Sequence, residues 1–296
     1  MSSSSPPSLY DRTVAAASGL IDPWIFMSLS LSYAPRAAHT ILTQRLSPPT
    51  SDSDSDSAAL PPLSWSRFRD VWFMHFWSFA GPGVREGAEP SVLPLLEGRP
   101  LDAAQPVAPP VGGVVLELGA GSGFWVDVWR RPGVQRVYGV EPNPDQHAAL
   151  RRAVRRAGLE DVYEIVPVGI EDLQGAKGKK WEGGIEKGSV DCIVSILCLC
   201  SIPDPEANIK ELYSYLKPGG RWYAYEHVRA EYSWYMRLYQ RFLNLFWPHL
   251  IGGCLLCRPT EKTLREAGPW SRIDVGQPPA EQWFHCVPHI AGVFTK

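Results

Sequence analysis

Residues 114–123 read Val-Val-Leu-Glu-Leu-Gly-Ala-Gly-Ser-Gly, and this stretch decides the fold. An apolar run of strand-forming residues breaks into three alternating glycines, and a helical pattern follows. The stretch indicates the first strand, the turn and the start of the first helix of a nucleotide-binding α/β sheet. Glycine removes Cβ where the chain turns sharply, so backbone N–H groups can approach a ligand closely.

The next apolar run, 137–140, ends at an acidic residue, Glu141. A carboxylate at that place can accept hydrogen bonds from both hydroxyls of a ribose. The dinucleotide fingerprint has its third glycine one residue later than Gly123, and Phe124 occupies that position here. The pattern therefore favours a mononucleoside such as S-adenosyl-L-methionine over NAD, and it disfavours an NAD-dependent oxidoreductase on the same fold.

Strand and helix patterns alternate from residue 111 to the end of the chain. The expected strands are 114–118, 136–140, 163–168, 190–197, 221–226, 271–275 and 287–294, and the expected helices are 124–131, 144–157, 205–216, 232–251 and 260–267. This order predicts an α/β fold: a doubly wound, mostly parallel seven-stranded sheet. Its ligand should lie beyond the carboxyl ends of the strands.

Composition excludes some partners and favours a reducing compartment. The 296 residues carry a net charge of −2, and the pI is near 6.4, so no electrostatic footprint for nucleic acid is expected. The six cysteines fall mostly inside apolar runs, and no cleavable signal peptide is recognisable. A cytosol-facing location is therefore expected.

The N-terminal segment, 1–46, contains an unusually apolar stretch. Its longest charge-free part, 23–35, has 13 residues, which is short of the ~20 that a spanning helix needs. We expect a helical extension that lies in a membrane interface, with packing on the protein's own core as the alternative. Residues 47–62 contain alternating serine and aspartate and are expected to be an acidic low-complexity linker.

Residues 63–110 are expected to form an aromatic helical cap on the main domain, 111–296. Five aromatic side chains recur at helical spacing over 64–79: Trp65, Phe68, Trp72, Phe76 and Phe79. This stripe predicts an amphipathic helix that docks on the main domain. Lining an apolar substrate pocket or touching a membrane are compatible further roles.

Five ordered motifs across ~110 residues resemble those of the class I S-adenosylmethionine-dependent methyltransferases. They are the glycine turn, Glu141-Pro142-Asn143-Pro144, the run 169–173, Gly188-Ser189-Val190-Asp191 and Leu216-Lys217-Pro218-Gly219-Gly220. The resemblance implies the Rossmann-like methyltransferase fold with S-adenosyl-L-methionine as cofactor.

A narrower resemblance, over 114–296, is to the small membrane-associated methyltransferase-like proteins that S-methylate alkyl thiols, and to their fungal relatives. The residues that carry it are Leu199-Cys200-Ser201-Ile202, Glu226-His227-Val228, Gly253-Cys254, Arg258, Pro288-His289-Ile290, Gly292 and Lys296. The chain departs from that group in a longer insertion at 174–187 and in Gly252, where the group tends to carry an acid. The resemblance implies a small lipophilic acceptor and a place on the cytoplasmic side of the endoplasmic reticulum or another membrane. It leaves the oligomeric state open.

The resemblance also implies which residues bind the cofactor. The turn of Gly119, Ala120, Gly121 and Gly123 would cradle the methionine portion, with Glu117 orienting the turn. The remaining candidates are Glu141 at the ribose with Pro142 and Asn143 beside it, Ile170 and Glu171 at the adenine, and Leu197 and Cys198 under the sulfonium. Plain packing is an equal alternative for Ile170 and Leu197.

His227 is the candidate catalytic residue, as a base or as a group that orients the acceptor. The alternative is a hydrogen-bonded pair with Glu226 that fixes the loop. His289 fits a structural histidine better, and Cys198 and Cys200 fit buried apolar residues. Cys254-x-x-Cys257 has no second ligand pair at zinc-like spacing, so no metal is predicted.

Two functions compete at this point. The first is an S-adenosylmethionine-dependent methyltransferase acting on a small lipophilic acceptor, a thiol first and a hydroxyl second. The second is a catalytically inactive methyltransferase-like binding or scaffold protein at a membrane. The intact glycine turn and Glu141 favour the first.

Overall fold

A computed structural model of the chain describes residues 8–46, 64–175, 181–282 and 284–296. The predicted linker, 47–62, lies outside the described residues, and so do residues 176–180 of the predicted insertion.

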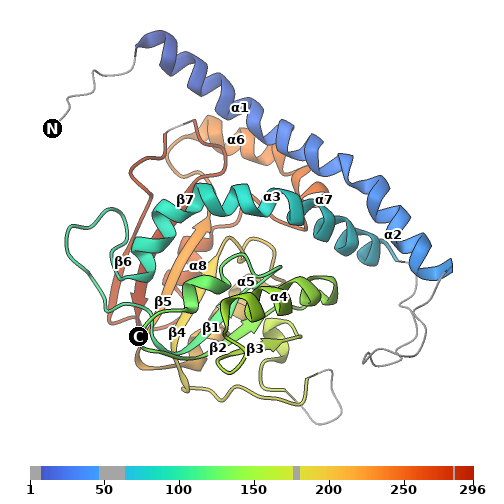
Figure 1. Cartoon of the computed structure of the whole chain (residues 1–296). Helices are drawn as coiled ribbons and strands as arrows, with labels where there is room; N and C mark the ends of the chain where they lie inside the picture. Colours follow the sequence, from blue (N-terminus) through green and yellow to red (C-terminus); the bar gives the residue numbers. More distant parts are fainter. Residues whose placement is uncertain (1–7, 47–63, 176–180, 283) are drawn as a thin grey trace.

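Within the described residues, seven strands form one sheet in the order β3-β2-β1-β4-β5-β7-β6 (Figure 1). They are β1 (Gly113–Leu118), β2 (Val134–Val140), β3 (Tyr163–Val166), β4 (Val190–Ile196), β5 (Leu216–His227), β6 (Arg272–Gly276) and β7 (His289–Thr295). Strands β1 to β5 are parallel, and β7 is antiparallel to both β5 and β6. The predicted doubly wound, mostly parallel α/β fold is therefore confirmed.

Helices cover both faces of the sheet, and the N-terminal helices form a third apolar cluster with other helices. They are α1 (Leu9–Ser32), α2 (Ala34–Leu46), α3 (Trp65–Leu96), α4 (Pro144–Ala157), α5 (Pro205–Tyr215), α6 (Trp234–Leu243), α7 (Trp247–Leu250) and α8 (Thr260–Arg265), with the 3₁₀ helices η1 (Val126–Trp129) and η2 (Ile170–Asp172). Side chains alternate between the faces along each strand, so that Val115 joins one core and Leu116 the other.

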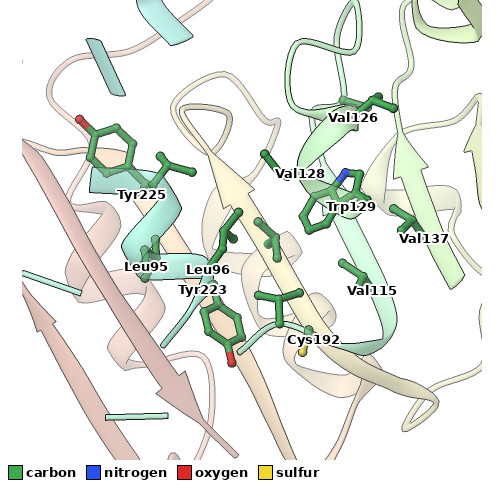
Figure 2. Close-up of a cluster of buried hydrophobic side chains, with 14 of the residues drawn as sticks. Leu95, Leu96, Val115, Val126, Val128, Trp129, Val137, Cys192, Tyr223 and Tyr225 are labelled. Atoms are coloured by element: carbon green, nitrogen blue, oxygen red, sulfur yellow. The ribbon is translucent and has the colours of Figure 1, made fainter. Parts of the chain in front are cut away.

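The first core lies between the sheet and the helices α3, η1 and α4. Figure 2 shows Leu95 and Leu96 of α3 gathered with Tyr223 and Tyr225 of β5 and with Trp129 of η1. The second half of α3 is thus part of the main domain's core. The second core, on the opposite face, buries side chains of α5 and α8.

A third apolar cluster joins the N-terminal helices to the region that follows the carboxyl ends of β4 and β5. It contains Met27 and Ile41 from α1 and α2, Trp72 and Phe76 from α3, and Trp247 from α7. Figure 1 shows α1 and α2 as one long rod above the sheet, with α6 beside α1. Hydrogen bonds tie this rod down: Trp24 Nε1 donates to Tyr239 Oη at 2.9 Å, and Ser30 Oγ donates to the Leu250 carbonyl at 2.5 Å.

Three elements differ from the sequence expectation. Helix α3 continues to Leu96 through three prolines, because its second half buries apolar residues against the sheet. The expected helix 232–251 is split into α6 and α7, since Pro248 has no N–H to bond the carbonyl four residues earlier. The expected helix 124–131 is only the short 3₁₀ helix η1.

Candidate active site

The three glycines of the turn have positive φ angles, +69° at Gly119, +55° at Gly121 and +82° at Gly123, but different surroundings. A Cβ on Gly119 would lie 2.6 Å from Cβ of Cys198, and one on Gly123 would lie 2.7 Å from Ala153 of α4. At Gly121 the nearest atoms would be 3.9 Å away. Gly119 and Gly123 therefore allow close packing, whereas Gly121 leaves space above the backbone for a ligand.

Glu141 lies at the same edge of the sheet as the glycine turn. Its carboxylate accepts hydrogen bonds from the backbone N–H groups of Gly121 and Asn143, both at 2.8 Å. The residue is buried, with 8% of its surface exposed. Asn143 also caps α4 by accepting from the Asp145 N–H at 3.0 Å. The predicted ribose-binding carboxylate and the turn are thus brought together, with exposed Pro142 beside them.

Glu117 lies beneath the turn and faces the core. Its Oε2 accepts from Trp129 Nε1 at 2.8 Å and from Tyr163 Oη at 2.5 Å. Burial raises the pKa of Glu117 to about 7, against the opposing effect of these two hydrogen bonds. These contacts support the predicted orienting role rather than a direct contact with a ligand.

Residues after β3 complete this edge of the sheet. The Ile170 side chain is 6% exposed and packs in the core below η2, so only its backbone is placed to face an adenine. Glu171 is exposed beside it. The Ala120 side chain, like that of Ile170, is buried, and its N–H donates to the Val140 carbonyl at 3.0 Å.

The loop after β4 is held by Glu226. Leu197 has a φ of +55°, unusual for a residue with a side chain, and its N–H donates to the Tyr225 carbonyl at 2.8 Å. Glu226 accepts from the N–H of Cys198 at 3.3 Å and of Leu199 at 3.1 Å. Burial raises the pKa of Glu226 to about 8.

Glu226 and His227 do not form the pair that the sequence suggested as an alternative. As neighbours on a strand they point to opposite sides, and each has other partners. His227 Nε2 lies 3.1 Å from Cys254 Sγ, which also accepts from Trp247 Nε1 at 3.0 Å.

The structure brings His227 together with Cys200 and Cys254. All three residues are buried, and their ligand-type atoms lie within 4.8 Å of one another. A hydrogen bond from the Cys254 thiol, together with nearby His227, holds the pKa of Cys200 well below its ordinary value, whereas burial raises the pKa of Cys254. Cys257, the other half of the Cys-x-x-Cys pattern, is not in this group. Sequence reasoning missed the cluster.

His289 has a structural setting, as expected. Its ring stacks on Tyr225 at 5.0 Å, and its Nδ1 pairs with Glu281 Oε1 at 2.5 Å.

Helix α3 runs across the glycine turn and the start of α4. Arg67 forms a two-pronged ion pair with Asp145, and Arg85 forms one with Asp127 at 2.7 and 2.8 Å. Between these pairs, Nε1 of Trp77 lies 3.9 Å from the position that a Cβ on Gly121 would occupy. Phe73 stacks on Trp77 at 5.4 Å. The aromatic helix therefore covers the place where a ligand would rest on the turn.

Comparison with known proteins identifies the family. A family model described as a methyltransferase domain matches residues 96–267. Thiol S-methyltransferase TMT1B of Homo sapiens is 31% identical over 183 residues, covering 62% of this chain and 70% of that protein. Thiol S-methyltransferase TMT1A of Homo sapiens is 32% identical, also over 183 residues with the same coverage.

Two solved structures share the fold. The [4+2]-cyclase SpnF has a TM-score of 0.55 and 13% identity, covering 81% of this chain and 99% of that one. A putative methyltransferase of Haloferax volcanii, in complex with the Trm112 activator, has a TM-score of 0.50 and 17% identity, covering 75% and 96%. At these identities the structures show the fold alone. The family match, the identity to these relatives and the glycine turn beside Glu141 agree. The chain belongs to the S-adenosylmethionine-dependent methyltransferases.

Proposed function

We propose that this methyltransferase transfers the methyl group of S-adenosyl-L-methionine to the sulfur of a small lipophilic thiol. The observation that carries the choice of thiol is the 31–32% identity to thiol S-methyltransferases, extending over 183 residues. The apolar third cluster beside the carboxyl ends of β4 and β5 supports a lipophilic acceptor.

Methyl transfer needs little catalytic assistance once the protein holds the donor and the acceptor in line. The acceptor thiol loses its proton to solvent, and the thiolate attacks the methyl carbon of the sulfonium. A new sulfur–carbon bond forms while the old one breaks, and S-adenosylhomocysteine leaves with the electron pair. A thiol with pKa about 8.5 needs far less help than a hydroxyl, so orientation supplies most of the rate.

The donor side is assigned to the turn and its partners. Gly121 and Glu141 would bind the methionine portion and the ribose, and the segment of Ile170 and Glu171 would face the adenine. Leu197 and Cys198 would lie under the sulfonium, since Cys198 packs directly on Gly119. His227, at the end of β5 in the same region, would orient the acceptor.

Two alternatives have less support. A hydroxyl acceptor is favoured by 30% identity over 131 residues to a ubiquinone biosynthesis O-methyltransferase of Xanthomonas axonopodis, but that match covers only 42% of this chain. The inactive scaffold is opposed by the open space at Gly121 and by the placement of Glu141 beside it.

We also propose that α1 and α6 lie in a membrane interface, on the cytoplasmic side of a membrane such as the endoplasmic reticulum. Among the described residues, Thr13–Leu46 is long and apolar enough to cross a membrane by length and composition. Exposed apolar side chains on these helices and the residues after α6 include Val14, Ile21, Ile25, Leu31, Trp234, Tyr235, Leu238, Phe242, Leu245 and Phe246. Because Trp24 packs against both Phe242 and Phe246, α1 lies along the protein, which favours an interfacial position over a spanning one.

The test is turnover with donor labelled in the methyl group, across matched alkyl thiols, phenols and amines. Methylation of thiols alone, lost in Glu141→Ala, is the expected result. Glu141→Ala should weaken S-adenosylhomocysteine binding by about 1.5–3 kcal/mol, on the scale of a lost hydrogen bond to a charged group, whereas Glu164→Ala on β3 should not. Methylation of phenols or amines in place of thiols would refute the thiol assignment, and an absence of donor binding would support the scaffold.

A further inference from the structure

Cys200, His227 and Cys254 form a buried cluster of two thiols and an imidazole. Its three residues come from the loop after β4, the end of β5 and the segment after α7, and the third apolar cluster surrounds them. Burying two thiols and an imidazole together is costly unless they satisfy one another or hold a further group.

The imidazole of His227 is only half satisfied. One ring nitrogen lies 3.1 Å from Cys254 Sγ. Within the described part of the chain, the other nitrogen, Nδ1, is buried without a hydrogen-bond partner, although the residue is 5% exposed. An unpaired buried nitrogen costs about 1–3 kcal/mol, so the folded state would gain stability if the imidazole bonded a further group.

The donor set is specific. Two thiolates and one imidazole are soft or borderline ligands, which suit Zn²⁺ and not the oxygen-loving Mg²⁺ or Ca²⁺. In a tetrahedral zinc site with bonds of ~2.3 Å to sulfur and ~2.0 Å to nitrogen, the ligand atoms are about 3.5–3.8 Å apart. The observed atoms, all within 4.8 Å of one another, need only small side-chain movements to reach that geometry.

We propose that Cys200, His227 and Cys254 bind one zinc-type cation with a fourth position left open. Three protein ligands and one exchangeable position are the arrangement of catalytic rather than structural zinc sites. This inference rests on the proposed function in one respect: the open position takes the sulfur of the acceptor thiol.

The placement agrees with that role. Cys200 is two residues beyond Cys198, which packs on Gly119 of the donor turn, so one loop joins the two sites. Coordination to the cation would deprotonate the acceptor thiol, whose proton leaves to solvent. The bound thiolate would then attack the methyl carbon, and the sulfonium would leave as neutral S-adenosylhomocysteine. Arg258 donates to the Leu199 carbonyl at 2.7 Å and interacts electrostatically with Cys200 and Cys254, so its charge would offset part of the negative charge of a third thiolate.

The test begins with the full-length protein, freed of metal and titrated with Co²⁺ as a spectroscopic substitute for zinc. We expect one Co²⁺ per chain, with a thiolate-to-cobalt charge-transfer band and the strong visible bands of tetrahedral coordination. Cys254→Ser and His227→Ala should each weaken binding by about 100-fold or more, because losing even an outer partner of a ligand costs 10–100-fold. The matched control is Cys257→Ser, three residues away, which should bind Co²⁺ like the wild type.

Wild-type protein alone can overturn the proposal, whatever the folding of the variants. Failure to bind stoichiometric Co²⁺, or bands without charge transfer from sulfur, would overturn the proposal. An equal loss of Co²⁺ affinity in Cys257→Ser and Cys254→Ser would also overturn it. Near-ultraviolet circular dichroism would identify variants that do not fold.

A second measurement addresses the open position. A short alkyl thiol added to the Co²⁺ protein should strengthen the charge-transfer band saturably, whereas the corresponding alcohol should not. An unchanged band would overturn the acceptor role. Full thiol methylation by metal-free protein would reject the inference and keep the proposed function. Metal binding without turnover on any thiol would keep the cation site and reject the proposed function.

Discussion

Gly119 and Gly188 have almost the same backbone conformation, with φ of +69° and +70°, and opposite surroundings. A Cβ at 119 would meet Cys198 at 2.6 Å, whereas one at 188 would have no atom within 4 Å. Both Gly→Ala changes should destabilise the fold by about 1 kcal/mol for the left-handed backbone. Only Gly119→Ala should also push the end of β4 away from the turn.

We therefore expect Gly119→Ala to weaken S-adenosylhomocysteine binding by about 5- to 150-fold, on the scale of an overpacked contact of 1–3 kcal/mol, and Gly188→Ala to leave it unchanged. Isothermal titration calorimetry measures the affinities, and urea unfolding measures the shared stability cost. Equal affinities in the two variants would contradict the packing argument.

Glu117 gives the folded state a pH dependence that can be isolated. Its pKa is about 7 in the folded protein because of burial, against 4.5 in the unfolded chain. Between these values the folded state binds more protons than the unfolded state, so stability falls as pH rises. The loss begins near pH 4.5, is complete above pH 7 and amounts to about 3 kcal/mol.

Glu117→Gln removes this titration. The free energy of unfolding of the variant, relative to wild type, should rise by about 3 kcal/mol between pH 4.5 and pH 8. Urea unfolding at several pH values measures it, with Glu160→Gln, an exposed carboxyl after α4, as the control. Parallel pH profiles for wild type and Glu117→Gln would disprove the assignment. Glu226 titrates in all three proteins and cancels.

At this scale the sequence predicted that the glycine turn and Glu141 lie at one edge of the sheet, because a glycine pattern and an acid at a strand end are local signals. Their roles in cofactor binding stay predictions. It missed the cluster of Cys200, His227 and Cys254 because no spacing rule links three distant segments. One signal was available: three of the segments that carry the narrower resemblance each hold one of these residues.

Among the elements, α3 covers the predicted donor edge with Trp77 and is joined to it by ion pairs at Arg67 and Arg85. Trp77→Ala should weaken S-adenosylhomocysteine binding by up to about tenfold, because a stacked aromatic contributes about 0.5–1.5 kcal/mol beyond its area.

Trp65→Ala is the matched control, on the same helix but 60% exposed, and it should bind S-adenosylhomocysteine like wild type. Calorimetry with both variants measures the difference. A result in which Trp65→Ala is the weaker binder, or in which neither differs from wild type, would remove α3 from the donor site.

Helix bounds were predictable where local chemistry fixes them. Helix α4 has the predicted bounds because Asn143 caps its start, Pro144 occupies its first position and Gly158 ends it with a φ of +64°. Helix α3 was predicted to end at Phe79, 17 residues too early, since its second half is stabilised by the sheet and not by its own sequence.

For the whole molecule, the exposed apolar residues of α1 make membrane association testable without deleting a helix that belongs to the third cluster. Ile25→Asp with Leu31→Asp should move the protein from the membrane to the soluble fraction, because each aspartate costs several kcal/mol in an apolar environment. Ala207→Asp, exposed on α5, is the control for an aspartate added elsewhere on the surface. Fractionation of cells, or flotation with anionic vesicles, gives the readout. Unaltered membrane association of the double variant would reject the interfacial position.

Ser30 links this surface to the covering helices, because its carbonyl accepts from Trp72 of α3 at 2.6 Å while its hydroxyl bonds Leu250 of α7. The helix proposed to meet lipid is therefore also bound to the two elements beside the donor and acceptor positions. A lipophilic acceptor dissolved in the bilayer would then arrive by two-dimensional diffusion, without passing through water. Its supply to the enzyme would be governed by its partition coefficient rather than by its aqueous solubility.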